Sequence, residues 1–427
     1  MEVISSMFEY FEALPTQNSV LYHFYQEYSP VTAITHLGPI DFNISGSDDL
    51  YLDLSTSYLI LETCITKQDG LTKPGDAIDV SPVNLALHSL FQSAELKIGN
   101  TLVSDQNGYY PYRALLETLL SYSKNTQESQ LKNEMFAKDK AGKMLEFKSL
   151  TGGDNEGAVT RGTAYRSGAT VFLLGRPHLD LFHQAKAIPS RTPISLKLIR
   201  AADNFVLVTP AGGDPYKLII KSAKLYIHSY CVNPELIYAH EKMLQERNII
   251  LPYKHTALKI WTISMGSTAA HAELYHGTLP DRLIMCFVSH EAMSGGFQQN
   301  PFNFQHFDLN YVSLNVNGRR VPATAYTPDM KGNYLREYNS MLEGLNQLYT
   351  DRAVNISRDE YPAGYFFLVF PLTGDNSLAT LDTRNGSVSA DLRFGTATAA
   401  TINAVLYAEY STYLEIDKWR NVIPHMP

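Results

Sequence analysis

The sequence has few cysteines and tryptophans, and it has no long apolar run. Its three cysteines, Cys64, Cys231 and Cys286, are far apart and lack CxxC spacing, so they predict neither a disulfide framework nor a zinc site. We expect three small buried thiols. No stretch approaches the roughly 20 apolar residues of a membrane span, and the N-terminus lacks the basic flank of a signal peptide. We therefore expect no membrane span, and synthesis in the cytosol.

Basic residues are absent from the first part of the chain. Residues 1–66 contain nine acidic residues and no Lys or Arg, whereas the remainder has 34 acidic residues against 35 basic ones. Binding to a nucleic-acid backbone depends on Lys and Arg that displace counterions, and this chain has no basic arm or Lys/Arg run. The sequence predicts no direct, sequence-specific binding of nucleic acid.

The common catalytic motifs are also missing, including the phosphate-binding loop, GxGxxG after a strand, HExxH and GxSxG. His178-Leu179-Asp180 is the one pattern to weigh, because a jelly roll with His-x-Asp and a distant His, here His228 or His240, can bind Fe(II). Pro177 and the polar residues 183–186 instead indicate a loop with no reason to meet another histidine. We predict no enzyme, no catalytic residue, no metal and no cofactor.

Two smaller polar features have structural explanations. His88 lies in an apolar stretch, and we interpret it as a partly buried histidine with satisfied hydrogen bonds, since no nucleophile stands near it in the sequence. Arg319 and Arg320 are expected to be solvated turn residues.

What the chain does contain favours β-structure. Its 427 residues are 44% hydrophobic, with 27 Tyr and 19 Phe against 2 Trp, a bias typical of pleated, half-buried surfaces. About eight short strands are predicted in each half, without βαβ alternation. A helical connector from Pro234 to about Arg247, closed by Pro252, separates the halves. This predicts an all-β fold of two tandem eight-stranded antiparallel jelly rolls with short helices in the connecting loops. We divide the chain into an N-terminal arm (1–30), a first jelly roll (31–237) and a second jelly roll (238–427).

A duplicated pattern supports this division. Residues 94–104 predict a hairpin that turns at Gly99-Asn100, and residues 313–321 predict another that turns at Asn317-Gly318, the stronger turn signal. A short amphipathic helix follows each hairpin, and the closing strands at 223–230 and 404–410 resemble each other. Chance recurrence in a large β protein is the alternative explanation. The polar, Gly-rich segment 123–163 is expected to be a long insertion.

Five ordered segments resemble the double jelly-roll major capsid proteins of the Polinton (Maverick) and adintovirus group, relatives of adenovirus hexon and of virophage capsid proteins. They are Leu14-Pro15-Thr16-Gln17, Gly38-Pro39-Ile40-Asp41-Phe42, Asp49-Leu50-Tyr51-Leu52-Asp53-Leu54, Pro82-Val83-Asn84 with Leu87-His88-Ser89-Leu90-Phe91, and Tyr109-Tyr110-Pro111-Tyr112-Arg113 followed by Leu115, Glu117, Leu119-Leu120 and Tyr122. The match covers about the first 130 residues; the remainder agrees in strand pattern and length. The chain is shorter than the larger hexons, which implies modest outer loops at residues 123–163 and 266–300.

The resemblance implies a structural capsid protein of an icosahedral virion, assembled in the cytoplasm or nucleus of a host. Three chains would form a pseudo-hexameric capsomer, with neighbouring capsomers, penton and minor capsid proteins as further partners. We expect Tyr109, Tyr110, Pro111, Tyr112 and Arg113, and the N-terminal arm, to contribute to subunit contacts.

Three other functions remain as alternatives: a minor vertex capsid protein with a single jelly roll, a two-cupin metal-dependent oxygenase, and a carbohydrate-binding β-sandwich. Chain length and the second set of strands oppose the first, and the iron ligands discounted above oppose the second.

Overall fold

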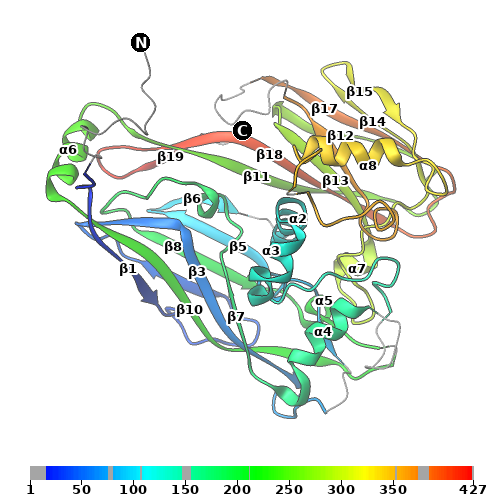
Figure 1. Cartoon of the computed structure of the whole chain (residues 1–427), viewed down its shortest axis with the longest axis horizontal. Helices are drawn as coiled ribbons and strands as arrows, with labels where there is room; N and C mark the ends of the chain where they lie inside the picture. Colours follow the sequence, from blue (N-terminus) through cyan, green and yellow to red (C-terminus); the bar gives the residue numbers. More distant parts are fainter. Residues whose placement is uncertain are drawn as a thin grey trace, which may run out of the picture.

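The computed structural model describes residues 16–75, 80–105, 108–146, 155–210, 212–351, 353–373 and 384–425. Strands dominate these ranges, and helices lie in the connections between them (Figure 1). The first half of the predicted N-terminal arm, residues 1–15, falls outside the described residues. Residues 20–28 of that arm form strand β1, which pairs with β10 and so lies in the first jelly roll.

The first jelly roll consists of two four-stranded antiparallel sheets. One has the order β1-β10-β3-β7 and the other the order β2-β8-β5-β6. The strands are β1 (Val20–Tyr28), β2 (Ile40–Ile44), β3 (Leu50–Lys67), β5 (Phe91–Ile98), β6 (Thr101–Asp105), β7 (Val171–Gly175), β8 (Ile194–Arg200) and β10 (Tyr216–Val232). Buried and half-exposed residues alternate along β8, as expected for a strand with one face on the core.

The second jelly roll repeats this order strand for strand. Its sheets run β11-β18-β13-β16 and β12-β17-β14-β15. The strands are β11 (Ile249–Ile263), β12 (Ala269–Thr278), β13 (Arg282–Ser289), β14 (Leu309–Val316), β15 (Arg319–Tyr326), β16 (Phe367–Pro371), β17 (Asn385–Phe394) and β18 (Ile402–Ile416), and the short β19 (Val422–Pro424) is added beside β18. The predicted double jelly roll is therefore confirmed.

The remaining elements are short. The strands β4 (Ser81–Pro82) and β9 (Leu207–Val208) form a two-stranded sheet. The helices are α1 (Ala86–Ser89), α2 (Tyr110–Ser121), α3 (Lys124–Glu128), η2 (Gln130–Glu134), α4 (Glu156–Ala164), η3 (Arg166–Gly168), η4 (Asp180–His183), α5 (Asp203–Val206), α6 (Pro234–Leu244), α7 (His290–Ser294) and α8 (Leu335–Gly344). The predicted connector corresponds to α6, whose cap residue Asn233 accepts a hydrogen bond from the Glu235 amide.

The duplicated hairpins are both present. Strands β5 and β6 pair with Ile98 opposite Thr101, and β14 and β15 pair with Val316 opposite Arg319. In the second turn Asn317 and Gly318 both have positive φ, of 51° and 79°, as the Asn-Gly signal predicted. Each hairpin leads into a helix, α2 or α8, and the closing strands are β10 and β18.

Two sequence expectations need correction. Segment 266–300 is not an outer loop, since it contains β12 and β13; β12 was missed because its Ala and His side chains are mostly half or fully exposed. Strand β11 begins at Ile249 and includes Pro252, where we had ended the connector. Proline is tolerated there because β11 is an edge strand, paired only with β18.

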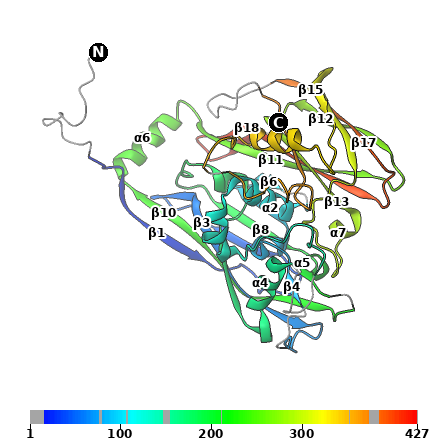
Figure 2. The same cartoon turned by 45° about the vertical axis from the view of Figure 1, so that its right-hand side comes forward.

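The hydrophobic core extends from one jelly roll into the other. Residues of α2, including Leu115 and Leu119, belong to the same buried cluster as Leu283 and Leu406 of the second roll. Residues at the far end of the second roll, including Leu414, join the core of the first. In both views α2 lies between the strands of the two rolls (Figures 1 and 2).

Candidate functional site

The contact between the two jelly rolls is built on helix α2. Pro111 occupies its first turn, where a missing N–H costs nothing. The apolar residues recur at helical spacing and are buried against the second roll: Tyr112, Leu115, Leu116, Leu119 and Leu120. Polar contacts extend the joint, because Gln347 Nε2 donates to the Leu120 carbonyl at 2.8 Å and Tyr365 Oη donates to the Asp139 carbonyl at 2.6 Å. The segment after the first hairpin therefore joins the two rolls.

Tyr112 is the aromatic centre of this joint. Its ring meets Phe205 of the first roll edge-on at 6.2 Å, and Phe302 of the second roll at 5.7 Å. Its side chain is 2% exposed. Edge-to-face pairs of this kind add about 0.5–1.5 kcal/mol beyond the area they bury.

Arg113 carries an ion network across the same joint. Its guanidinium pairs with Glu117 at 2.8 Å on its own helix and with Asp180 at 2.7 Å. Asp180 in turn bonds to His255 Nδ1 of β11 at 2.8 Å, and Tyr407 Oη of β18 donates to Glu117 at 3.2 Å. The chain of charges thus begins in the first roll and ends on two strands of the second.

Burial and pairing act in opposite directions on these groups. Burial disfavours the ionised form of Glu117, but the charge of Arg113 and the nearby His183 and His178 hold its pKa well below the usual range. Burial also disfavours the ionised form of Asp180, but Arg113 and His255 outweigh this effect and lower the pKa of Asp180. Both carboxylates are ionised, so Arg113 cannot be removed without leaving uncompensated buried charge.

The five residues predicted to contact another subunit lie at this joint within one chain. Tyr110, Tyr112 and Arg113 are each at most 2% exposed. Tyr109 and Pro111 line a cavity of about 180 Å³ together with Phe205 and Met293. Tyr109 alone is half-buried, so among the five it retains surface for a partner. A subunit contact at these positions stays a prediction.

The iron arrangement weighed in the sequence does not form. Asp180 is paired with Arg113 and His255, and His178 with Glu117. His228 lies on β10 beside His23, and His240 lies on α6 beside Tyr51. However, we were wrong that the loop around His178 meets no other histidine. The ring centroid of His178 is 4.6 Å from that of His88, and Asp180 bonds to His255.

The sequence analysis assigned no role to Glu117, Glu134 or His255. Glu117 lies 61 positions before its partner His178, and Asp180 lies 75 positions before His255. The available signal was local: Arg113 and Glu117 stand four residues apart on an otherwise apolar helix, the spacing of a helical ion pair.

A second candidate surface is the outer face of the sheet β1-β10-β3-β7, here called the first outer face. Its side chains include Tyr25, Tyr58, Ile60, Phe172, Leu174, Tyr226, His228 and Tyr230. The Tyr58 and Tyr226 rings stack at 5.2 Å, and Tyr25 and His228 stack at 4.5 Å. Phe172 is 68% exposed and Tyr25 is 45% exposed. The face is rich in aromatic side chains, also carries Glu27, Glu62 and Lys224, and is partly open to solvent.

The corresponding face of the second sheet, the second outer face, is covered. Tyr407 and Ile284 pair across β18 and β13 on this face, and both are buried. Helix α2 reaches Tyr407 through Glu117, while α8 reaches Arg282, whose guanidinium donates to the Gly344 carbonyl at 3.2 Å. The residues from Leu283 to Val288 are buried on both sides of β13.

No protein-family model matches the chain. It is 24% identical over 406 residues to the Caenorhabditis elegans "Uncharacterized protein F54H12.2", a match that covers 90% of this chain and 93% of the nematode protein.

Solved viral structures share the fold over nearly the whole chain. A chain of the Sputnik virophage structure aligns with a TM-score of 0.64 at 9% identity, covering 100% of this chain and 93% of the other. The faustovirus major capsid protein aligns at 0.58 with 10% identity, covering 97% and 92%. The mavirus major capsid protein aligns at 0.52 with 10% identity, covering 100% and 96%. Among the described residues, no helix is both long enough and apolar enough to cross a membrane.

Proposed function

We propose that the chain is the major capsid protein of an icosahedral particle. The observation that carries this proposal is the likeness to the faustovirus and mavirus major capsid proteins, which covers 97% and 100% of this chain. A capsid protein catalyses no reaction. The buried network of Arg113 fits such a role, because its charged groups are paired with one another.

We propose further that three copies form a capsomer with a nearly sixfold outline. Within one chain, helix α2 of the first roll covers part of the second outer face. The first outer face belongs to the equivalent sheet of the first jelly roll, but it is partly exposed to solvent. A head-to-tail contact, in which the second roll of one copy covers the first outer face of the next, would repeat that arrangement and close a ring of three chains. The division of the chain near residue 237 is part of this proposal, with β1 included in the first roll.

The particle we propose belongs to the Polinton and adintovirus group. The resemblance of the first 130 residues supports this, and the nematode relative fits a capsid gene carried by an animal genome. As a structural component of such a virion, the protein would meet neighbouring capsomers and vertex proteins.

The test is the mass of the purified chain under native conditions. We expect a species of three times the 47.8 kDa chain mass, with six-sided outlines in negative-stain images. A monomer at micromolar concentration, with no six-sided particles, would contradict the proposal.

Variants locate the contact. Phe172→Ser combined with Tyr25→Ser should shift the protein from trimer to monomer, because each buried aromatic side chain contributes about 1.5–3 kcal/mol. Leu71→Ser is the matched control, since Leu71 is 86% exposed in a turn beyond the end of the sheet. Equal trimer populations in the double variant and the control would exclude the first outer face as the contact.

A further inference from the structure

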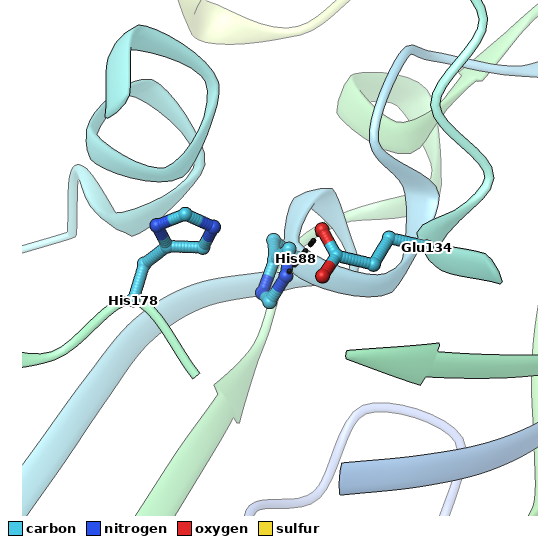
Figure 3. Close-up of side chains that lie close together, drawn as sticks. All are labelled: His88, Glu134 and His178. Carbon is cyan, nitrogen blue, oxygen red and sulfur yellow. Dashed lines mark ion pairs between the residues drawn. The ribbon is translucent and has the colours of Figure 1, made fainter. Parts of the chain in front are cut away.

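Three buried side chains from separate segments converge beside the joint. His88 lies on α1, Glu134 ends η2, and His178 lies between β7 and η4. Each offers a ligand atom, and these atoms all lie within 4.8 Å of one another. Figure 3 shows the Glu134 carboxylate beside the His88 ring, with one nitrogen of His178 turned toward them.

Two of these atoms lack a hydrogen-bond partner in the described structure. His88 Nε2 and Glu134 Oε2 are both buried, and they face each other as an ion pair at 3.4 Å without a hydrogen bond to any described group. His88 is only 2% exposed. Buried polar atoms are almost always satisfied, so this pair points to a missing ligand.

The other nitrogen of each imidazole ring is already occupied. His88 Nδ1 bonds to Tyr110 Oη at 2.9 Å, and His178 Nδ1 bonds to Glu117 Oε2 at 2.5 Å. Glu117 is itself held by Arg113. In the tautomers that carry the proton on Nδ1, the lone pair of each Nε2 is free. Tyr110 Oη would then accept from both His88 Nδ1 and the His178 amide. This is the arrangement in which metal-binding histidines are fixed by a carboxylate or another acceptor.

Space also suits a cation beside Glu134. Gly175 leaves room for the carboxylate, because a Cβ there would lie 2.5 Å from Glu134 Cγ and Oε1.

We propose that His88, Glu134 and His178 bind one divalent transition-metal ion, with zinc as the best fit. Two imidazoles and a carboxylate are a common zinc ligand set. The ion would tie α1, η2 and the loop after β7 together beneath α2. This inference depends on the fold of a single chain and not on the proposed capsid role.

The experiment measures metal content and affinity. The full chain is stripped with a chelator, titrated with Zn²⁺ or Co²⁺, dialysed, and analysed by inductively coupled plasma mass spectrometry; Co²⁺ adds a visible absorption band that reports its coordination. We expect close to one ion per chain and a zinc-dependent rise in melting temperature. Glu134→Gln should abolish both, whereas Glu273→Gln, which alters the exposed pair with His276, should change neither.

A second variant guards against misfolding. Tyr110→Phe keeps the ring but removes the partner of His88 Nδ1, and we expect about tenfold weaker zinc affinity with an unchanged circular dichroism spectrum. The proposal is overturned if the wild-type chain retains no stoichiometric zinc or cobalt, or if Glu134→Gln and Tyr110→Phe both bind as tightly as the wild type. Either result would mean that the cluster is an ion network only.

Discussion

The two jelly rolls have the same strand order, yet their equivalent outer faces differ in exposure. On the first outer face, Phe172 and Tyr25 remain open to solvent. On the second, Ile284 and Tyr407 are buried beneath α2 and α8. Topology alone therefore does not decide which face is covered; the helices in the connections do.

The difference is already visible in the strands. Along β3, from Tyr58 to Glu62, half-exposed and buried residues alternate, as in a strand with one covered face. Along β13, the residues from Leu283 to Val288 are continuously apolar and buried on both faces. The two equivalent strands therefore differ: β3 alternates and β13 is continuously apolar. This difference indicates that the outer face of the second jelly roll forms a contact within the chain, whereas that of the first does not.

Removing Arg113 should break the covered side most severely. In Arg113→Met, the buried carboxylates of Glu117 and Asp180 lose their shared cation, and we expect a loss of about 3–5 kcal/mol in the free energy of unfolding. Chemical denaturation followed by circular dichroism measures it. Arg191→Met, which removes an exposed pair with Asp48, is the control and should cost under about 1 kcal/mol. Equal effects would contradict the role of Arg113 in joining the rolls.

A matched pair of isoleucines compares the two faces directly. Ile284→Ala on the second outer face should cost about 2–5 kcal/mol in chain stability, because it leaves a cavity in a packed core. Ile60→Ala on the first outer face removes a half-exposed side chain, so it should cost less in a monomer. Thermal unfolding at low protein concentration measures both. A larger loss for Ile60→Ala would reverse the comparison.

Tyr407→Phe tests a single bond across the joint. It removes the hydroxyl that donates to Glu117 while keeping the ring. A net loss of about 1 kcal/mol is expected. In the Arg113→Met background the loss should change, because the two groups share Glu117. Strict additivity in a double-mutant cycle would argue that they act independently.

Lys138→Met should have the smallest effect. The ammonium pairs with Glu360 of the second roll at 2.7 Å, but both side chains are partly exposed. Solvent screening limits such a pair to under about 1 kcal/mol. A loss as large as that of Arg113→Met would show that the rim of the joint matters as much as its centre.

Local signals predicted much of the fold. Asn317-Gly318 fixed one hairpin, the leucines of α2 indicated its buried side, and the repeated strand pattern indicated two jelly rolls. The partner of α2 could not be predicted in the same way, because residues that meet across the joint, such as Glu117 and Tyr407, stand 290 positions apart. The convergence of His88, Glu134 and His178 is likewise a product of tertiary packing and leaves no spacing in the sequence.

Cryo-electron microscopy of the purified, concentrated chain tests the central claim most directly. We expect six-sided trimers in which density from the second jelly roll of a neighbouring copy lies over Phe172 and Tyr25. Trimers or larger particles in which that face is open to solvent, or a population of single chains only, would contradict the account.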